Sequence, residues 1–243
     1  MDCIMKITYL SHSGFLVELQ HSYLLFDYYR GEIPELNKSK VLYIFVSHKH
    51  EDHYSFSIWN LKDEYPKVKY ILSKDVPFTE NVRKKRGLTD DILPHTLRVN
   101  GNNHYSFDEL EISTLKSTDA GVAFLVETEG VKIYHSGDLN LWAWKDADEE
   151  YNRKMRQLYC MQIDKMKDEI PDVAFFPLDS RQEEYAYEGL DYFRKMVDAR
   201  HIFPMHTWGK YEIISLYKKE RKETPNIEKV YEIKKEGESF QIL

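Results

Sequence analysis

Four strand-like apolar runs in this 243-residue chain are each followed, within three residues, by side chains that can bind metals or transfer protons. The runs and the residues after them are Val41–Val46 with His48 to His53, Val131–Tyr134 with His135 to Asp138, Val173–Phe176 with Asp179 to Arg181, and Ile202–Phe203 with His206. In α/β sheets, strand ends that share an edge gather such side chains into one crevice. The pattern predicts a layered α/β protein whose site is built from strand ends.

Apolar patterning places the remaining elements around these four runs. Further strands are expected at Ile7–Leu10, Phe15–Leu19, Tyr23–Asp27, Val68–Leu72, Leu110–Leu115, Val122–Glu127, Val230–Ile233 and Ser239–Ile242. Two of the four runs are expected to form the slightly longer strands Val131–His135 and His201–Phe203. Helices are expected at Ser57–Glu64, Asp148–Asp168, Tyr187–Ala199 and Tyr211–Arg221. Glu129-Gly130 lies between two β-prone runs and predicts a hairpin there. Because no repeat or linker is visible, residues 1–243 are expected to form a single domain.

Composition restricts the partners and the compartment. The 34 basic against 41 acidic side chains give a net charge of −7, which disfavours a broad nucleic-acid surface. No apolar run is long enough for a membrane span, and no signal peptide is visible at the start. The two cysteines, Cys3 and Cys160, form neither a disulfide framework nor a thiolate metal site. We therefore expect a reduced, cytoplasmic protein; the oligomeric state is left open.

The run from His48 to His53 carries the most chemical information. His48 and His50 alternate on an extended segment, so both side chains can reach one ion. If the chain then turns, Asp52 and His53 can face a second ion. Neutral imidazole with carboxylate suits zinc, or manganese or iron in a more open site. A solvated charged loop would explain one or two of these histidines, but explains three histidines and an aspartate at this spacing poorly.

The motif His-x-His-x-Asp-His resembles the signature of the metallo-β-lactamase superfamily of metal-dependent hydrolases. The other landmarks of that superfamily follow in order: Asp27 at a strand end, Gly137-Asp138 after a strand, and His206 late in the chain. The opening His12-Ser13-Gly14-Phe15 resembles the branch that includes L-ascorbate-6-phosphate lactonase-like proteins. The resemblance runs from about residue 6 to residue 210.

This resemblance implies an α/β fold of the four-layer αβ/βα sandwich type, with two mixed sheets packed face to face and helices outside. It also implies one or two divalent metal ions as cofactors, with zinc favoured and manganese or iron as alternatives. The implied roles are His48 and His50 as ligands of a first ion, Asp52, His53 and His206 as ligands of a second, Asp138 as a bridging ligand, and Asp27 as support for the histidine loop.

One expected ligand is missing from the sequence. The family supplies a third histidine to the first ion from the loop before the strand at Val122–Glu127, but here residues 115–121 contain none. Asp119 is the predicted replacement, Thr118 is a weaker candidate, and His135 is another candidate substitute. An ordinary turn aspartate before glycine explains Asp119 equally well. A carboxylate in place of the histidine would shift the preference from zinc toward manganese or iron.

The expected activity is metal-dependent hydrolysis, in which a metal-bound hydroxide cleaves an ester, lactone or phosphoester bond of a small anionic substrate. Asp52 and Asp138 are the predicted catalytic residues. Three alternatives remain: a nuclease, a cyclic-nucleotide phosphodiesterase, and a non-catalytic protein with a degenerate first metal site. The basic run Arg83–Arg86 would favour the nuclease, although such runs commonly form a solvated helix face.

Four residues are predicted to contact the substrate. Arg181 could clamp a carboxylate or phosphate, or could instead form a surface pair with Glu183 or Glu184. Trp208 could wall the pocket, or could simply pack at its rim. His12 enters the site by analogy with the lactonase-like branch, and His135 lies next to the Gly137-Asp138 landmark. A buried structural histidine is the alternative for His12.

Overall fold

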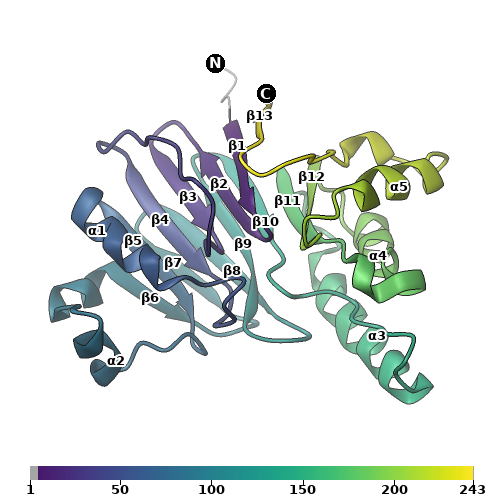
Figure 1. The fold of residues 1–243 in the computed structure, drawn as a ribbon, viewed down its shortest axis with the longest axis horizontal. Coiled ribbons are helices and arrows are strands. Elements are labelled where there is room, and N and C mark those ends of the chain that lie inside the picture. The colour runs from purple at the N-terminus through teal and green to yellow at the C-terminus, as the bar shows by residue number, and fades with distance from the viewer. Residues whose placement is uncertain (1–4, 243) are drawn as a thin grey trace. The chain divides into compact units, whose positions relative to one another are not determined.

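A computed structural model describes residues 5–242, so Cys3 lies outside the described residues. The chain divides into two units, which are residues 5–100 with 236–242, and residues 101–235. Each unit contains one mixed sheet, coloured from purple to yellow along the chain in Figure 1. The prediction of a single domain over the whole chain stays a prediction.

The first unit is built on a seven-stranded sheet in the order β13-β1-β2-β3-β4-β5-β6. Its strands are β1 (Met5–Ser11), β2 (Gly14–Glu18), β3 (Ser22–Phe26), β4 (Val41–Val46), β5 (Val68–Ser73), β6 (Thr96–Val99) and β13 (Ser239–Ile242). The strands from β3 to β6 are parallel, whereas β13, β1, β2 and β3 pair antiparallel. The carboxyl ends of the parallel strands therefore share one edge of this sheet.

Short helices cover one face of the first sheet (Figure 1). They are η1 (Phe56–Asn60), α1 (Leu61–Glu64), α2 (Glu80–Lys85) and η2 (Asp90–His95). Ile44 and Tyr70 on the sheet pack in one core with Ile58 and Trp59 from η1. Burying such side chains supplies most of the stabilisation, at roughly 25 cal/mol per Å² of apolar surface.

The second unit is built on a six-stranded sheet in the order β12-β11-β10-β9-β8-β7. Its strands are β7 (His104–Phe107), β8 (Leu110–Lys116), β9 (Val122–Thr128), β10 (Val131–His135), β11 (Val173–Pro177) and β12 (His201–Met205). The neighbours β10, β11 and β12 are parallel, so the residues that follow them lie at one edge. The predicted hairpin joins β9 to β10, with positive φ at Glu129 and Gly130.

Helices pack against the parallel half of the second sheet. They are α3 (Glu149–Ile163), η3 (Asp164–Met166), η4 (Ser180–Tyr185), α4 (Glu188–Met196), α5 (Glu212–Glu220) and η5 (Ile227–Lys229). Asp148 caps α3 by accepting a hydrogen bond from the Tyr151 amide. Phe193 of α4 stacks on Phe176 of β11 at 4.9 Å and on Tyr134 of β10 at 5.3 Å. This aromatic contact fixes α4 beside the strands whose ends carry Asp138 and Asp179.

One strand prediction was wrong. Val230–Ile233 is not a strand, because only Val230 pairs with the sheet, through a single parallel bridge to Ile202. The chain then leaves this unit, and its last strand β13 pairs with β1 in the first unit. Otherwise the predicted fold class is confirmed: two mixed sheets of seven and six strands, with helices.

Candidate metal-binding residues

The histidine-rich loop begins directly after β4 in the first unit. His48 and His53 are fully buried, Asp52 is half-buried and His50 is exposed. The loop turns at His50, whose carbonyl accepts hydrogen bonds from the amides of His53 and Tyr54, both at 3.0 Å. This turn brings His53 back beside His48, with 4.1 Å between the ring centroids.

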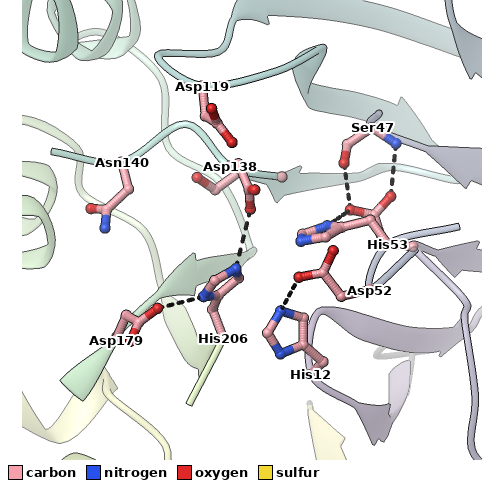
Figure 2. A network of polar contacts seen from close by, with 12 residues as sticks. His12, Ser47, Asp52, His53, Asp119, Asp138, Asn140, Asp179 and His206 are labelled. Atoms are coloured by element: carbon pink, nitrogen blue, oxygen red, sulfur yellow. Dashed lines mark hydrogen bonds and ion pairs between the residues drawn. The ribbon is translucent and has the colours of Figure 1, made fainter. Parts of the chain in front are cut away.

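Asp27 holds this loop from the end of β3. Its carboxylate is fully buried and accepts hydrogen bonds from the Ser47 amide at 2.7 Å, the Ser47 hydroxyl at 2.5 Å and His53 Nδ1 at 2.8 Å (Figure 2). Asp27 also has a φ of 41°, a conformation that is uncommon outside glycine. The expected role of Asp27 as support for the histidine loop is thus borne out by its contacts.

These hydrogen bonds determine the tautomers of two histidines. The Ser47 hydroxyl uses its only proton in the hydrogen bond to Asp27. It must therefore accept the hydrogen bond from His48 Nδ1, which lies 2.9 Å away. His53 likewise donates from Nδ1 to Asp27. Both rings therefore present the lone pair of Nε2 as a ligand atom. Carboxylate or hydroxyl partners on Nδ1 are the usual outer contacts of metal-binding histidines.

The candidate ligand atoms of this unit are close enough together to hold an ion. One atom each from His48, His50 and Asp52 lie within 4.8 Å of one another, and so do single atoms from Asp27, His48 and His53. Neutral imidazole nitrogens with carboxylate oxygens form a donor set that suits a divalent transition metal. The residues present therefore fit the metal that the sequence motif implies.

His12 contacts this group from the turn between β1 and β2. Its Nε2 lies 3.4 Å from Asp52 Oδ2, and its ring lies 5.4 Å from that of His53. Burial would raise the pKa of the Asp52 carboxyl, but the contacts with His12 and His53 lower it below its usual value. The turn is so tight that a Cβ atom at Gly14 would lie only 3.0 Å from the Ser11 carbonyl oxygen.

In the second unit, Asp138 and His206 follow the parallel strands β10 and β12. His206 Nδ1 lies 2.9 Å from Asp179 Oδ2, while His206 Nε2 lies 3.5 Å from Asp138 Oδ1 (Figure 2). Asp179 is a charged acceptor, so His206 donates from Nδ1, and in the neutral ring the Nε2 lone pair would face the Asp138 carboxylate. The two atoms, His206 Nε2 and Asp138 Oδ1, would then both be acceptors, and a cation bound to both would remove the repulsion between their lone pairs.

Sequence reasoning named Asp179 among the reactive residues at strand ends but gave it no role in the site. Asp179 follows β11, it is fully buried, and it also accepts hydrogen bonds from Arg181 Nη2 at 2.6 Å and from Trp208 Nε1 at 3.3 Å. Burial would raise the pKa of its carboxyl, but His206 and Arg181 lower it below its usual value. Its position directly after a strand was the only signal in the sequence.

The predicted substrate residues lie in different environments. Arg181 pairs with Asp179 rather than with a neighbouring glutamate, and Glu183 pairs with Lys145. Trp208 is exposed, and the Arg181 guanidinium stacks over its ring at 4.5 Å. His135 is fully buried in β10, where its Nδ1 accepts a hydrogen bond from the Gly137 amide at 3.1 Å.

The loop that lacks the expected histidine contacts the Asp138 loop. The Thr118 hydroxyl donates to the Asn140 carbonyl at 2.6 Å and accepts from the Asn140 amide at 3.2 Å. Asp119 is exposed, and one of its carboxylate oxygens lies within 4.8 Å of one from Asp138. Asp119 is thus close to another predicted ligand of the same unit, whereas the Thr118 hydroxyl is occupied by the backbone.

The basic run Arg83–Arg86 lies on and just after α2. Arg83 pairs with Asp90 and Lys84 pairs with Glu80, while Arg86 stacks over the Phe56 ring. Local ion pairs and an aromatic contact thus engage three of the four cations. Within residues 5–242, no helix has both the length and the apolarity that a membrane span requires.

Fold and donor set together define a metal-binding α/β protein. The family model of the beta-lactamase superfamily domain matches residues 6–151, which is more than half of the chain. The chain therefore belongs to this family, and the predicted superfamily is confirmed.

Relatives of the chain are named metal-dependent hydrolases, and a solved structure shares its fold. The chain is 29% identical over 150 residues to a UPF0173 metal-dependent hydrolase of Opitutus terrae, a match that covers 57% of this chain and 64% of that protein. The chain thus spans less than two thirds of that relative's length. A protein of the same name from Desulforamulus reducens is 25% identical over 222 residues, covering 84% and 86%. Igni18, a metallo hydrolase from Ignicoccus hospitalis, has the same fold, with a TM-score of 0.66, 16% identity and 99% of both chains covered.

Proposed function

We propose that the protein is a metal-dependent hydrolase that cleaves an ester, lactone or phosphoester bond of a small anionic molecule. The observation that carries the proposal is the fixed tautomer of three histidines. His48, His53 and His206 each use Nδ1 in a hydrogen bond, to Ser47, Asp27 and Asp179 respectively, so Nε2 is the atom that each neutral ring would offer to a metal. The names of the relatives as metal-dependent hydrolases support the same activity.

The proposed ligands are those that the resemblance implies, with Asp119 added as the replacement for the missing third histidine. They are His48, His50, Asp52, His53, Asp119, Asp138 and His206, with zinc as the first choice of metal and manganese or iron as alternatives. Support from geometry comes from the contacts within each unit. The family match over residues 6–151 spans all of these residues except His206. Such an ion lowers the pKa of bound water to about 7, so hydroxide is available at neutral pH.

The residues of this chain would then orient the ion and the reactants. Asp27 and Asp179 hold the imidazole rings, and donating a hydrogen bond to a carboxylate raises the basicity of such ligands. We expect Asp52, whose contact with His12 favours the ionised carboxylate, to orient the attacking water or take up its proton. The finer hypothesis, lactonase chemistry, rests on the motif His12-Ser13-Gly14-Phe15.

The test combines metal content with activity. Protein loaded with zinc, manganese or iron would be assayed against lactones, phosphodiesters, thioesters and β-lactams, with elemental analysis of each preparation. His50→Ala and Asp138→Ala are expected to abolish hydrolysis, and Asp119→Ala to lower the metal content. His104→Ala is the matched control, because His104 is exposed on β7 and pairs with Glu111. Full activity in His50→Ala, or a protein that binds none of the three metals, would contradict the proposal.

A further inference from the structure

Asp179 joins three residues into one rigid group in the second unit. Its Oδ2 accepts hydrogen bonds from His206 Nδ1 at 2.9 Å and from Arg181 Nη2 at 2.6 Å, and its Oδ1 accepts from Arg181 Nε at 3.0 Å. The same Oδ2 also lies 3.3 Å from Trp208 Nε1. Because Asp179 is fully buried, the metal-ligand candidate His206 and the two more exposed residues share a single anchor.

The Arg181 guanidinium is held in one orientation. Nε and Nη2 form a bidentate pair with Asp179, and Cζ lies over the Trp208 ring, 4.5 Å from its centroid. Among residues 5–242, Nη1 donates to no protein atom, and 47% of the side chain is exposed to solvent. A planar fork fixed in this way presents its outer donors with little loss of side-chain freedom on binding.

The backbone of this group is also unusual. His206 and Trp208 have φ angles of 63° and 54°, and Glu183 has a φ of 50°. Non-glycine residues adopt this conformation rarely, and such strain gathers at ligand sites where the surroundings enforce it. At Trp208 the strained backbone holds a large ring at the surface, where 46% of it is exposed. A purely structural tryptophan would more commonly be buried.

We propose that Arg181 and Trp208 form a subsite for the negatively charged group of the substrate, a carboxylate or a phosphate. Arginine donors in a fork match the oxygen spacing of both anions. Asp179 is the positioning residue that links this subsite to His206. The inference rests on the proposed function, because it takes His206 as a metal ligand and the bound anion as part of the hydrolysed molecule.

The pairing with Asp179 determines how the anion is recognised. The carboxylate neutralises much of the guanidinium charge, so attraction at a distance is weak and direct hydrogen bonds from Nη1 and Nη2 supply the affinity. Arginine can donate to Asp179 from two nitrogen atoms and to a ligand from its remaining N–H groups. A lysine at position 181 has a single nitrogen atom and could not do both in this way. Arg181→Lys is therefore expected to weaken anion binding although it keeps the charge.

The first test compares two esters of similar length, the anionic 4-nitrophenyl hemisuccinate and the neutral 4-nitrophenyl butyrate. With zinc-loaded protein, Arg181→Met is expected to lower the ratio of kcat/KM values, hemisuccinate over butyrate, by about tenfold or more through the KM of the anionic ester. Arg200→Met is the matched control, since Arg200 is 65% exposed in the same unit and pairs with Asp172. A ratio in Arg181→Met within twofold of the wild-type value would overturn the subsite.

A second measurement separates the subsite from the hydrolase activity. Tryptophan fluorescence would be titrated with succinate and with inorganic phosphate, and Trp208→Phe would identify the responding ring. The tighter anion shows which group the subsite prefers. If the wild type cleaves neither ester, the proposed activity fails for these substrates, yet a fluorescence response lost in Arg181→Met still supports the subsite. Identical titrations of wild type and Arg181→Met would overturn it.

Asp179 can be tested with a readout that a merely structural residue would not change. Asp179→Asn keeps the shape of the side chain but removes its charge and part of its acceptor capacity. It is expected to weaken the binding of zinc and of the anion together, whereas Arg181→Met weakens only the anion. Unchanged zinc and anion affinities in Asp179→Asn would show that Asp179 does not position either group.

Discussion

Two aspartates, Asp27 and Asp179, perform the same task at different points of the chain. Each is fully buried, each accepts a hydrogen bond from Nδ1 of a histidine, and each follows a strand of its own sheet. A buried carboxylate is costly unless it is hydrogen-bonded. Here the donors come from backbone, serine and histidine at Asp27, and from histidine, arginine and tryptophan at Asp179.

The support by Asp27 can be tested with Asp27→Asn. An asparagine cannot accept from Ser47 and His53 on both of its terminal atoms, so the His53 tautomer is no longer enforced. We expect metal affinity to fall by about 10- to 100-fold. The free energy of unfolding should fall by about 1–3 kcal/mol, because buried donors lose their acceptor. A competitive chelator titration and urea denaturation measure the two effects.

The matched control for Asp27→Asn is Asp63→Asn. Asp63 lies in the same unit and its side chain is 75% exposed. Within residues 5–242, its ion pair is with the neighbouring Lys62. The Asp63→Asn protein should retain both affinity and stability within error. An Asp27→Asn protein with the metal affinity of the wild type would show that His53 does not need this partner.

At the residue scale, local spacing was informative and distant contacts were not. The run from His48 to His53 could be found because its ligands lie within six residues of sequence. The partner of His206 lies 27 positions away and carries no motif, so Asp179 was given no role. Arg181 was expected to bind a ligand or pair with Glu183 or Glu184, but a backbone turn brings its guanidinium onto Asp179, two positions earlier.

At the scale of elements, continuous apolar runs gave the strands that carry the site. Val41–Val46 coincides with β4, and Val173–Phe176 lies within β11. Such runs mark strands that are buried on both faces. Val230–Ile233 is also β-prone, although Glu232 interrupts it, and it pairs at only one residue. Composition alone does not reveal whether a free sheet edge lies beside a β-prone run.

The contact between two loops of the second unit leads to a prediction at this scale. Thr118→Val removes the hydroxyl that bonds both the carbonyl and the amide of Asn140. We expect the free energy of unfolding to fall by about 1–3 kcal/mol because two backbone groups lose their partner. Metal content should also fall, because Asp119 and Asp138 lie on the two loops.

Thr118→Ser is the control for this loop contact, since it keeps the hydroxyl and loses only a methyl group. It should retain most of the stability and the metal content, as measured by thermal unfolding and elemental analysis. If Thr118→Val and Thr118→Ser lose equal stability, the methyl packing rather than the hydrogen bonds holds the loops.

At the scale of the whole molecule, a metal that binds only the folded chain must stabilise it. At a free zinc concentration 100 times the dissociation constant, the stabilisation is about 2.7 kcal/mol. For a chain of this size, that corresponds to a rise in Tm of about 5–10 °C. Scanning calorimetry with and without chelator would measure the rise. His50→Ala should lose much of it and His104→Ala should keep it; an equal rise in all three proteins would exclude His50 as a ligand.

The strand β13 has a consequence for how the protein is made. It pairs with β1 through the register Met5 to Ile242, although all of the second unit lies between these two strands in sequence. On the ribosome, β1 is therefore synthesised long before its outer neighbour, and residues 101–235 emerge in the interval. Until β13 arrives, one side of β1 presents unpaired backbone groups to other nascent chains. Chaperone binding to the early chain, or a slow final folding phase confined to the first sheet, would be the signature of this delay.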